Sequence, residues 1–326
     1  MKQKLKNFWP YLISAILLVV LFSRIDFKDT WEAVKTANMT YLLAAMLIQF
    51  VSSILILWRW IILMKALGLK FKRFNSARWF FIGQFLNLIL PSSVGGDVFK
   101  GLGLSKETGH RPKVFASIVL DRMIGFVAIV MIAAVSFFFG RKIVNNQVIA
   151  LSIICMVGGL MTIAIVLFSH RIFSQVTKIF GAWPKVKDGL MKLHYDLVLM
   201  KGKLKEVVWA MLLSILAQII FASEFYFIAK AMHQKIGLVY FIIFSPLVCV
   251  VSSLPSIGGL GVREVGWVSL LSILSVPQGI AMGLSLISFA LLFIVGIFGG
   301  LFYVATLSAG RVQHHQADAQ FKPGHA

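Results

Sequence analysis

Long runs of apolar residues alternate with short polar, mostly basic segments along the whole chain. Runs of about 20 residues cross a hydrocarbon core of about 30 Å as helices. A shorter run at Phe8–Phe22 follows three lysines and is not followed by a small-x-small cleavage site, so we interpret it as an uncleaved first helix. The pattern predicts an all-α, polytopic integral membrane protein with about six spanning helices. The clearest runs are Tyr41–Met64, Val114–Phe139, Val148–Phe168, Val207–Ala229 and Ile280–Leu307.

The composition excludes an ordinary soluble domain. Of 326 residues, 59% are hydrophobic and 13% are charged, whereas soluble proteins carry about 25% charged residues. The net charge of +20 lies in short loops rather than on one soluble face, so we expect no nucleic-acid partner. Positive-inside topology explains this charge, and binding of anionic lipid headgroups is a compatible second explanation.

The distribution of lysine and arginine predicts the orientation. The N-terminal tail, the loop after Met64 and the connection Arg171–Glu206 are strongly basic, which indicates the cytoplasmic side of a bacterial inner membrane. Acidic residues balance the basic ones in Arg24–Thr40, which suits the outer side. We therefore expect both termini in the cytoplasm. Part of Arg171–Glu206 places apolar residues at helical spacing among lysines, a pattern typical of a helix in the membrane interface.

Two similar breaks interrupt apolar segments. The run Trp79–Leu90 is too short to span and ends at Pro91-Ser92-Ser93-Val94-Gly95-Gly96-Asp97, with basic loops on both sides. This predicts a re-entrant hairpin that enters and leaves on one side, which is tolerated only where protein or a cavity satisfies the backbone. A second break, Pro255–Gly261, interrupts Leu238–Leu274, which forms either another hairpin or a full crossing.

The two breaks indicate an internal repeat. Leu90-Pro91-Ser92-Ser93-Val94-Gly95-Gly96 aligns with Leu254-Pro255-Ser256-Ile257-Gly258-Gly259, and Gly95 and Gly258 differ by 163 positions, half of the 326 residues. Because the predicted orientations are opposite, we expect an inverted repeat, as in transporters with a substrate site between the repeats. The alternative is that each Pro-Gly-Gly is only a turn. The expected organisation is one membrane domain with units at about 40–140 and 207–308, an amphipathic connection at about 170–206 and a flexible tail at 309–326.

The breaks are also where we expect the site. Proline ends a helix, glycines allow backbone N–H groups to face a cavity, and a helix that begins there can bind an anion. Ionisable residues inside a membrane normally pair or line a polar path, and structural ion pairs are the alternative to a binding role. The expected substrate-binding residues are Ser92, Ser93, Gly95, Gly96, Asp97, Lys100, Asp121, Arg122, Ser256, Gly258, Gly259, Gly261, Arg263 and Glu264.

Specific pairs can be predicted among these residues. Asp121 and Arg122 are adjacent and lie about 100° apart on a helix, so we do not expect them to pair with each other. We predict the pairs Asp97–Arg122 and Asp121–Arg263. Arg59 and Glu224 lie in the helices that lead to each break, and snorkelling of Arg59 to the interface is an alternative to pairing.

The sequence offers no catalytic residue and no cofactor or metal site. No His or Asp base stands near the serines, and no Walker loop, dinucleotide fingerprint or zinc spacing occurs. The histidines of the tail (His314, His315 and His325) have no defined scaffold. A lipid-modifying enzyme remains an alternative, with Asp97 and Glu264 as the available acid–base pair.

Three blocks together resemble the lysylphosphatidylglycerol synthase transmembrane region, also called the flippase-like domain family. They are Leu90–Lys100, Asp121-Arg122-Met123-Ile124-Gly125 and Leu254–Glu264, in the family's order and within a likeness that covers nearly the whole chain. Lys100 stands where the family often has arginine. The full-length synthases also carry an aminoacyl-transferase domain after the membrane part, so we do not expect lysyl transfer from this chain alone.

The resemblance implies movement of a membrane lipid between leaflets. The lipid would be an aminoacyl-phosphatidylglycerol or a polyprenyl-linked glycolipid. Two alternatives stay open: an enzyme of lipid modification related to phosphatidylglycerol lysyltransferase, and a membrane partner of a separate synthase or glycosyltransferase.

Overall fold

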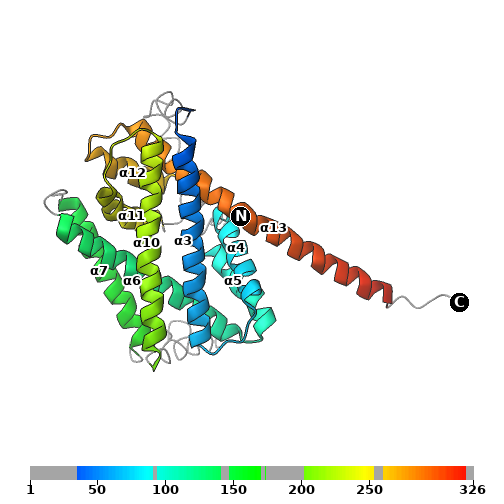
Figure 1. The fold of residues 1–326 in the computed structure, drawn as a ribbon. Helices are drawn as coiled ribbons and strands as arrows, with labels where there is room; N and C mark the ends of the chain where they lie inside the picture. Colours follow the sequence, from blue (N-terminus) through cyan, green and yellow to red (C-terminus); the bar gives the residue numbers. More distant parts are fainter. Residues whose placement is uncertain are drawn as a thin grey trace, which may run out of the picture.

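The protein is α-helical throughout the part that the computed structural model describes, which is residues 35–90, 94–140, 147–169, 173, 202–252 and 260–320. Figure 1 shows the helices gathered around a central pair, with the C-terminal helix projecting from the bundle. In chain order they are α3 (Met39–Ala66), α4 (Arg73–Ile89), α5 (Gly95–Thr108), α6 (Arg111–Gly140), α7 (Gln147–Phe168), α10 (Leu204–Ala231), α11 (Leu238–Ser252), α12 (Val262–Ser272) and α13 (Gln278–Gln320).

The long apolar runs form helices of membrane-spanning length. Within the described residues, four helices are long and apolar enough to cross a bilayer: Met39–Ala66, Arg111–Phe138, Leu204–Ala231 and Gln278–Thr306. They coincide with predicted runs and confirm a multi-pass membrane protein. A fifth predicted run forms the 22-residue helix α7. The predicted first helix at Phe8–Phe22 and residues 174–201 of the predicted interface helix lie outside the described residues.

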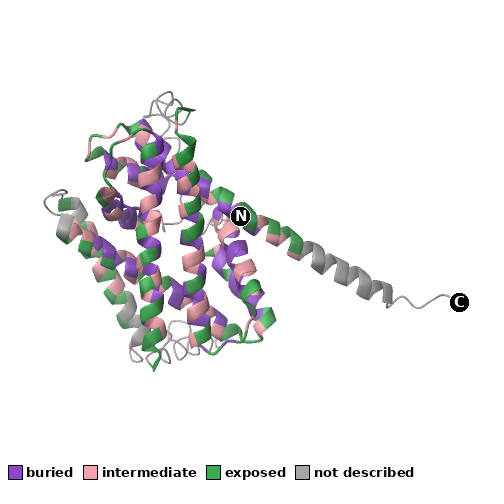
Figure 2. Cartoon of the chain, viewed as in Figure 1, coloured by how far each residue is buried: buried purple, intermediate pink, exposed green. Residues whose placement is uncertain are grey.

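Helices α3 and α10 run antiparallel at the centre of the bundle (Figure 1). The N–H of Asn38, just before α3, donates to the carbonyl of Ala231, the last residue of α10, at 2.9 Å. Further along, the Ser52 hydroxyl donates to the Ala217 carbonyl at 3.5 Å. The start of one helix therefore lies beside the end of the other. Buried residues occur both on this pair and on the shorter helices beside it (Figure 2).

The contacts between helices are the same in both halves of the chain. Helix α4 packs on α5 as α11 packs on α12, and α5 packs on α6 as α12 packs on α13. Across the halves, α4 packs on α13 just as α11 packs on α6. Exchanging α3–α6 for α10–α13 therefore leaves the pattern of contacts unchanged. Together with the antiparallel central pair, this is the contact pattern of an inverted repeat.

The ends of the central helices repeat the same local geometry. Gly68 after α3 and His233 after α10 both have positive φ, at 69° and 58°. The Gly68 N–H donates to the Lys65 carbonyl, and the His233 N–H donates to the Lys230 carbonyl. Such left-handed residues satisfy the last carbonyls of a helix and stop it. Lys65 and Lys230 therefore stand at equivalent helix ends in the two halves.

Helices α4 and α5 fold back on each other as the predicted helical hairpin. A Cβ atom added to Gly96 would lie 2.0 Å from the carbonyl oxygen of Gly83, so the two helices touch backbone to backbone. At the open end of the hairpin, the Glu107 carboxylate accepts hydrogen bonds from Asn75, Arg78 and Trp79. With 17 and 14 residues, both limbs are shorter than the roughly 20 residues of a full span.

Helices α11 and α12 pack together in the second half. With 15 and 11 residues they are also too short to span singly. The connecting residues 253–259 lie outside the described part of the chain, as do residues 91–93 of the first hairpin. Trp267 of α12 is fully buried against Phe225 of α10 and Phe241 of α11. These aromatic contacts fix the second hairpin to the central pair.

Candidate functional site

Asp97, in the first turn of α5, binds two cations. Its Oδ2 accepts a hydrogen bond from Arg122 Nε of α6 at 2.6 Å, and its Oδ1 lies 3.2 Å from Lys100 Nζ. The predicted pair Asp97–Arg122 is therefore confirmed. One carboxylate therefore faces two cations at this point. An acidic residue in a first helical turn also stabilises the N-terminus of α5.

The two cations of this group have different surroundings. Lys100 is buried, and its ammonium lies 4.3 Å from the ring centre of Trp60 and 5.7 Å from that of Phe80. The Arg122 side chain is 49% exposed, whereas the Asp97 side chain is 10% exposed. Lys100 is thus held by aromatic faces, which favour a desolvated cation. Arg122 is the cation that can meet a ligand from outside the protein.

Asp121 pairs with Arg59 of α3. Arg59 Nε donates to Asp121 Oδ1 at 2.7 Å, and a second guanidinium nitrogen donates to the Ser214 hydroxyl of α10 at 2.9 Å. Arg59 is only 8% exposed, so the snorkelling interpretation was wrong. Gly125 makes room for it, because a Cβ there would lie 3.1 Å from the guanidinium. The pair joins both central helices to α6.

The predicted pair of Asp121 and Arg263 was wrong. Arg263 donates instead to Glu264 Oε1 at 2.7 Å and to the Ser285 hydroxyl of α13 at 3.0 Å. Asp121 lies on the face of α6 that turns toward α3, while Arg263 turns toward α13. Adjacent residues can pair here because the Glu264 side chain folds back to the start of α12.

Glu264 also caps the N-terminus of α12. Its Oε2 accepts the N–H of Gly261 at 2.6 Å, and its Oε1 accepts the Ser285 hydroxyl at 3.0 Å. Gly261 has φ of 86°, a conformation suited to glycine. The carboxylate therefore caps α12 and fixes it to α13. This arrangement fits the structural alternative for Glu264.

At the first break, a backbone amide is also hydrogen-bonded within the protein. The N–H of Gly96 donates to Asn87 Oδ1 at 2.8 Å, so it is not available for an anion. Gly95 begins α5 beside Leu90. The expectation that these amides face a cavity is thus wrong for Gly96 and for Gly261. Five of the predicted site residues lie outside the described part of the chain, namely Ser92, Ser93, Ser256, Gly258 and Gly259.

Sequence reasoning missed a pair of polar contacts between helices, one partly buried and one buried, that recur in the two halves. Gln84 of α4 donates to Ser53 of α3 at 3.2 Å, and Gln218 of α10 donates to Ser245 of α11 at 3.4 Å. Positions 53 and 218 differ by 165, as do Lys65 and Lys230. The repeat offset, applied to polar residues inside apolar runs, was the signal that could have found them.

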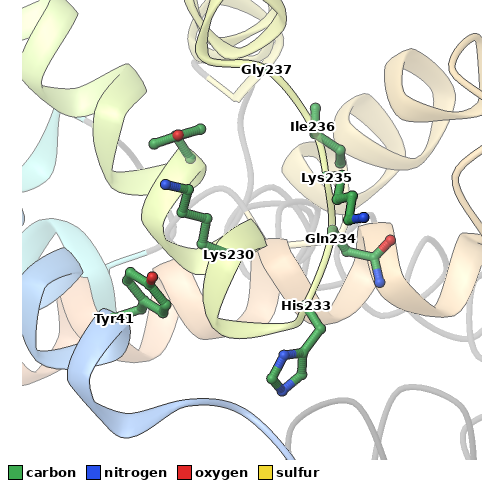
Figure 3. A pocket seen from close by; sticks show the side chains of 8 residues that line it. Tyr41, Lys230, His233, Gln234, Lys235, Ile236 and Gly237 are labelled. Carbon is green, nitrogen blue, oxygen red and sulfur yellow. The ribbon is translucent and has the colours of Figure 1, made fainter.

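A pocket of about 490 Å³ lies at the end of the bundle where α3 begins and α10 ends. Figure 3 shows Tyr41 and Lys230 on one side and the segment from His233 to Gly237 on the other. The Lys230 ammonium lies 4.7 Å from the ring centre of Tyr226. The lining residues are Tyr41, Tyr226, Lys230, His233, Gln234, Lys235, Ile236 and Gly237, and none belongs to the predicted site.

The helices and buried charges together define a multi-pass membrane protein whose two antiparallel halves share one arrangement. The family described as the lysylphosphatidylglycerol synthase TM region matches residues 7–300, and the chain belongs to this family of membrane proteins of lipid metabolism. It is also similar to the UPF0104 membrane protein PH1989 of Pyrococcus horikoshii. The two are 22% identical over 309 residues, which cover 87% of this chain and 92% of that protein.

Proposed function

We propose that this protein is a lipid flippase that moves a lipid with an anionic phosphate between leaflets. An aminoacyl-phosphatidylglycerol or a polyprenyl-linked glycolipid fits this description. The observation that carries the proposal is the matched set of contacts in the two antiparallel halves. Halves of opposite direction whose corresponding helices pack on corresponding neighbours can exchange their arrangements, which is the basis of alternating access in inverted-repeat transporters.

The buried charges favour transport over a purely structural role. Each ionisable residue inside a membrane costs at least about 2.5–3.5 kcal/mol on insertion scales, so such residues are seldom kept without a use. Here they join elements that would have to move relative to one another: α5 to α6 through Asp97 and Arg122, and α3 to α6 through Arg59 and Asp121.

The headgroup phosphate binds near Asp97, Lys100 and Arg122 in this proposal. Two cations face one carboxylate there, and the side chain of Arg122 is half exposed. A guanidinium binds phosphate oxygens through two parallel hydrogen bonds, which an ammonium does not. Ser92 and Ser93 directly precede α5 in sequence and belong to the same proposed site. Arg263, which Glu264 and Ser285 hold at the start of α12, is its counterpart in the second half.

The proposal also includes the orientation of the protein in the membrane. The basic loop between α3 and α4 faces the cytoplasm of a bacterial inner membrane, so both hairpin limbs α4 and α5 enter from the cytoplasmic side. The pocket beside Lys230 then lies at the opposite face.

Reconstitution tests the function. Purified protein is placed in vesicles that carry a fluorescent phosphatidylglycerol, and a membrane-impermeant reductant quenches the label on outer-leaflet lipid. A flippase makes nearly all of the label accessible, whereas protein-free vesicles protect the inner half. Protection equal to that of protein-free vesicles, for phosphatidylglycerol and for a polyprenyl phosphate probe, contradicts the proposal. A chemically changed lipid in these vesicles would instead indicate an enzyme, and stable co-purification with a synthase or glycosyltransferase would indicate a partner.

A further inference from the structure

Glu224 is a buried carboxylate about two turns before the end of spanning helix α10, and its two oxygens have unequal surroundings. The residue is 0% exposed. The Ser288 hydroxyl of α13 donates to Oε1 at 2.9 Å. Oε2 is buried and has no hydrogen-bond partner among the described residues. A side chain of this kind is not held as a structural ion pair.

In the first half of the chain, an ion pair occupies the place that corresponds to the contact between Glu224 and Ser288. Arg59 and Glu224 differ by 165 positions, and Asp121 and Ser288 differ by 167, so the two contacts occupy corresponding places. In the first half a guanidinium meets a carboxylate at 2.7 Å. In the second half the carboxylate meets only a hydroxyl. The repeat is thus asymmetric in charge at this point.

The other charged and titratable groups near Glu224 are already engaged or neutral. Helices α3, α6, α11 and α13 pack on α10. Arg59 of α3 and Asp121 of α6 pair with each other, and Arg59 contacts α10 at Ser214, ten residues before Glu224. The thiol of Cys249 comes from α11, and α13 contributes Ser288. The cation that acts on Glu224 is Arg263 of α12, whose guanidinium is bound to Glu264 and Ser285.

An ionised carboxylate in this position lacks the partners that buried charges require, whereas a protonated carboxyl is neutral and far less costly to bury. We infer that Glu224 is the proton-binding group that couples lipid movement to a proton gradient. This inference rests on the proposed flippase function. The ligand of the site is a proton, and the site comprises Glu224, Ser288 and Arg263.

The chemistry of the step is a simple acid dissociation. When water reaches Glu224 from one side, the O–H bond at Oε2 breaks, its electron pair stays on the carboxylate, and the proton passes to water. The new negative charge competes with Glu264 for Arg263. Because Glu264 also accepts the Gly261 N–H, loss of Arg263 loosens the start of α12 beside the second break. Proton release thereby changes the start of α12, which carries Arg263, the counterpart of the proposed headgroup site in the second half.

Infrared spectroscopy of the purified full-length protein tests the proton site without any transport. We expect the spectrum to contain the C=O stretch of a protonated carboxyl and this band to disappear when the pH is raised. We expect this band to be absent from Glu224→Gln and to persist in Glu206→Gln, the same chemical change in the first turn of the same helix. We expect Ser288→Ala to move the band to higher frequency, because the hydroxyl no longer donates to Oε1. A wild-type band that survives in Glu224→Gln, or that does not respond to Ser288→Ala, overturns the inference.

A pH gradient across reconstituted vesicles tests the coupling. We expect the gradient to make wild-type and Glu206→Gln protein enrich the labelled lipid in one leaflet at least several-fold. Glu224→Gln should equalise the leaflets regardless of the gradient. Gradient-driven enrichment by Glu224→Gln contradicts the coupling. If wild-type protein moves no lipid at all, the flippase proposal fails, while the infrared result still decides whether Glu224 holds a proton.

Discussion

Replacing Arg59 by methionine leaves a carboxylate buried without its partner. Both side chains of the Arg59–Asp121 pair are less than 10% exposed, and Arg59 also donates to Ser214 of α10. Removing one member of such a buried pair costs about 3–5 kcal/mol, because the remaining charge keeps its desolvation penalty. We therefore expect Arg59→Met to lower the free energy of unfolding by about 3–5 kcal/mol.

The double variant Arg59→Met/Asp121→Leu separates charge from packing. With both charges gone, no uncompensated carboxylate remains, and exchanges of this kind are often neutral or stabilising. We expect the double variant to regain most of the loss. Arg78→Met is the matched control, because its pair with Glu107 is about a quarter exposed at the end of the hairpin. Pairs at exposed positions contribute about 0–1 kcal/mol.

The assay is reversible unfolding in mixed detergent micelles, followed by tryptophan fluorescence and circular dichroism. All four proteins are compared at one pH and one detergent composition. A loss below about 1 kcal/mol for Arg59→Met would refute the reasoning, because it would place the pair in a solvated setting. A double variant as unstable as Arg59→Met would show that shape, rather than charge, makes this contact important.

Two further predictions concern the hairpins. Gly96→Ala should prevent close packing of α4 on α5, because its Cβ would lie 2.0 Å from the Gly83 carbonyl oxygen; unfolding measurements should show a loss of about 1–3 kcal/mol or more. Gly158→Ala in α7, where an added Cβ meets nothing within 4 Å, is the control and should be neutral or slightly stabilising, and equal losses for the two would count against the packing argument. Glu264→Ala removes the acceptor of the Gly261 N–H and the partner of Arg263. Hydrogen exchange at the first turn of α12 should then become markedly faster, and unchanged exchange would exclude Glu264 as its cap.

The helical hairpins and the repeat could be predicted because they depend on local signals. Runs of apolar residues define spans, proline and glycine end helices, and lysine-rich loops set direction. These signals act within a few residues of one another. The 163-residue offset between Gly95 and Gly258 then indicated that the two similar breaks belong to one internal repeat. The contacts between the helices show the same repeat.

The partners of the buried charges were harder to predict. Asp97 and Arg122 lie on neighbouring helices, α5 and α6, so their pairing needed only short connections. Asp121 precedes Arg122 by one position on α6. The rotation of about 100° between adjacent helical residues directs its side chain toward α3 instead of α5. Which helix occupies that direction depends on the packing of the whole bundle. Sequence spacing alone carries no such information.

The most informative sequence signal was the comparison of the halves. Arg59 and Glu224 occupy corresponding positions but carry opposite charges. The sequence alone therefore indicates that the repeat is asymmetric in charge at this position. The prediction of free amides at Gly96 and Gly261 was wrong for another reason. Asn87 and Glu264 lie close to them in sequence, and their side chains accept hydrogen bonds from these two N–H groups.

Lipid movement by reconstituted Arg122→Gln, compared with wild-type protein and with Arg78→Gln, tests the central claim most directly. Arg122 is the exposed cation of the proposed headgroup site, and Arg78 undergoes the same chemical change at the end of the hairpin. We expect wild-type and Arg78→Gln protein to expose inner-leaflet phosphatidylglycerol at similar rates, and Arg122→Gln to be at least about tenfold slower, which corresponds to about 1.4 kcal/mol. Equal rates for wild-type protein and both variants would contradict the proposed site, and no movement by wild-type protein would contradict the function itself.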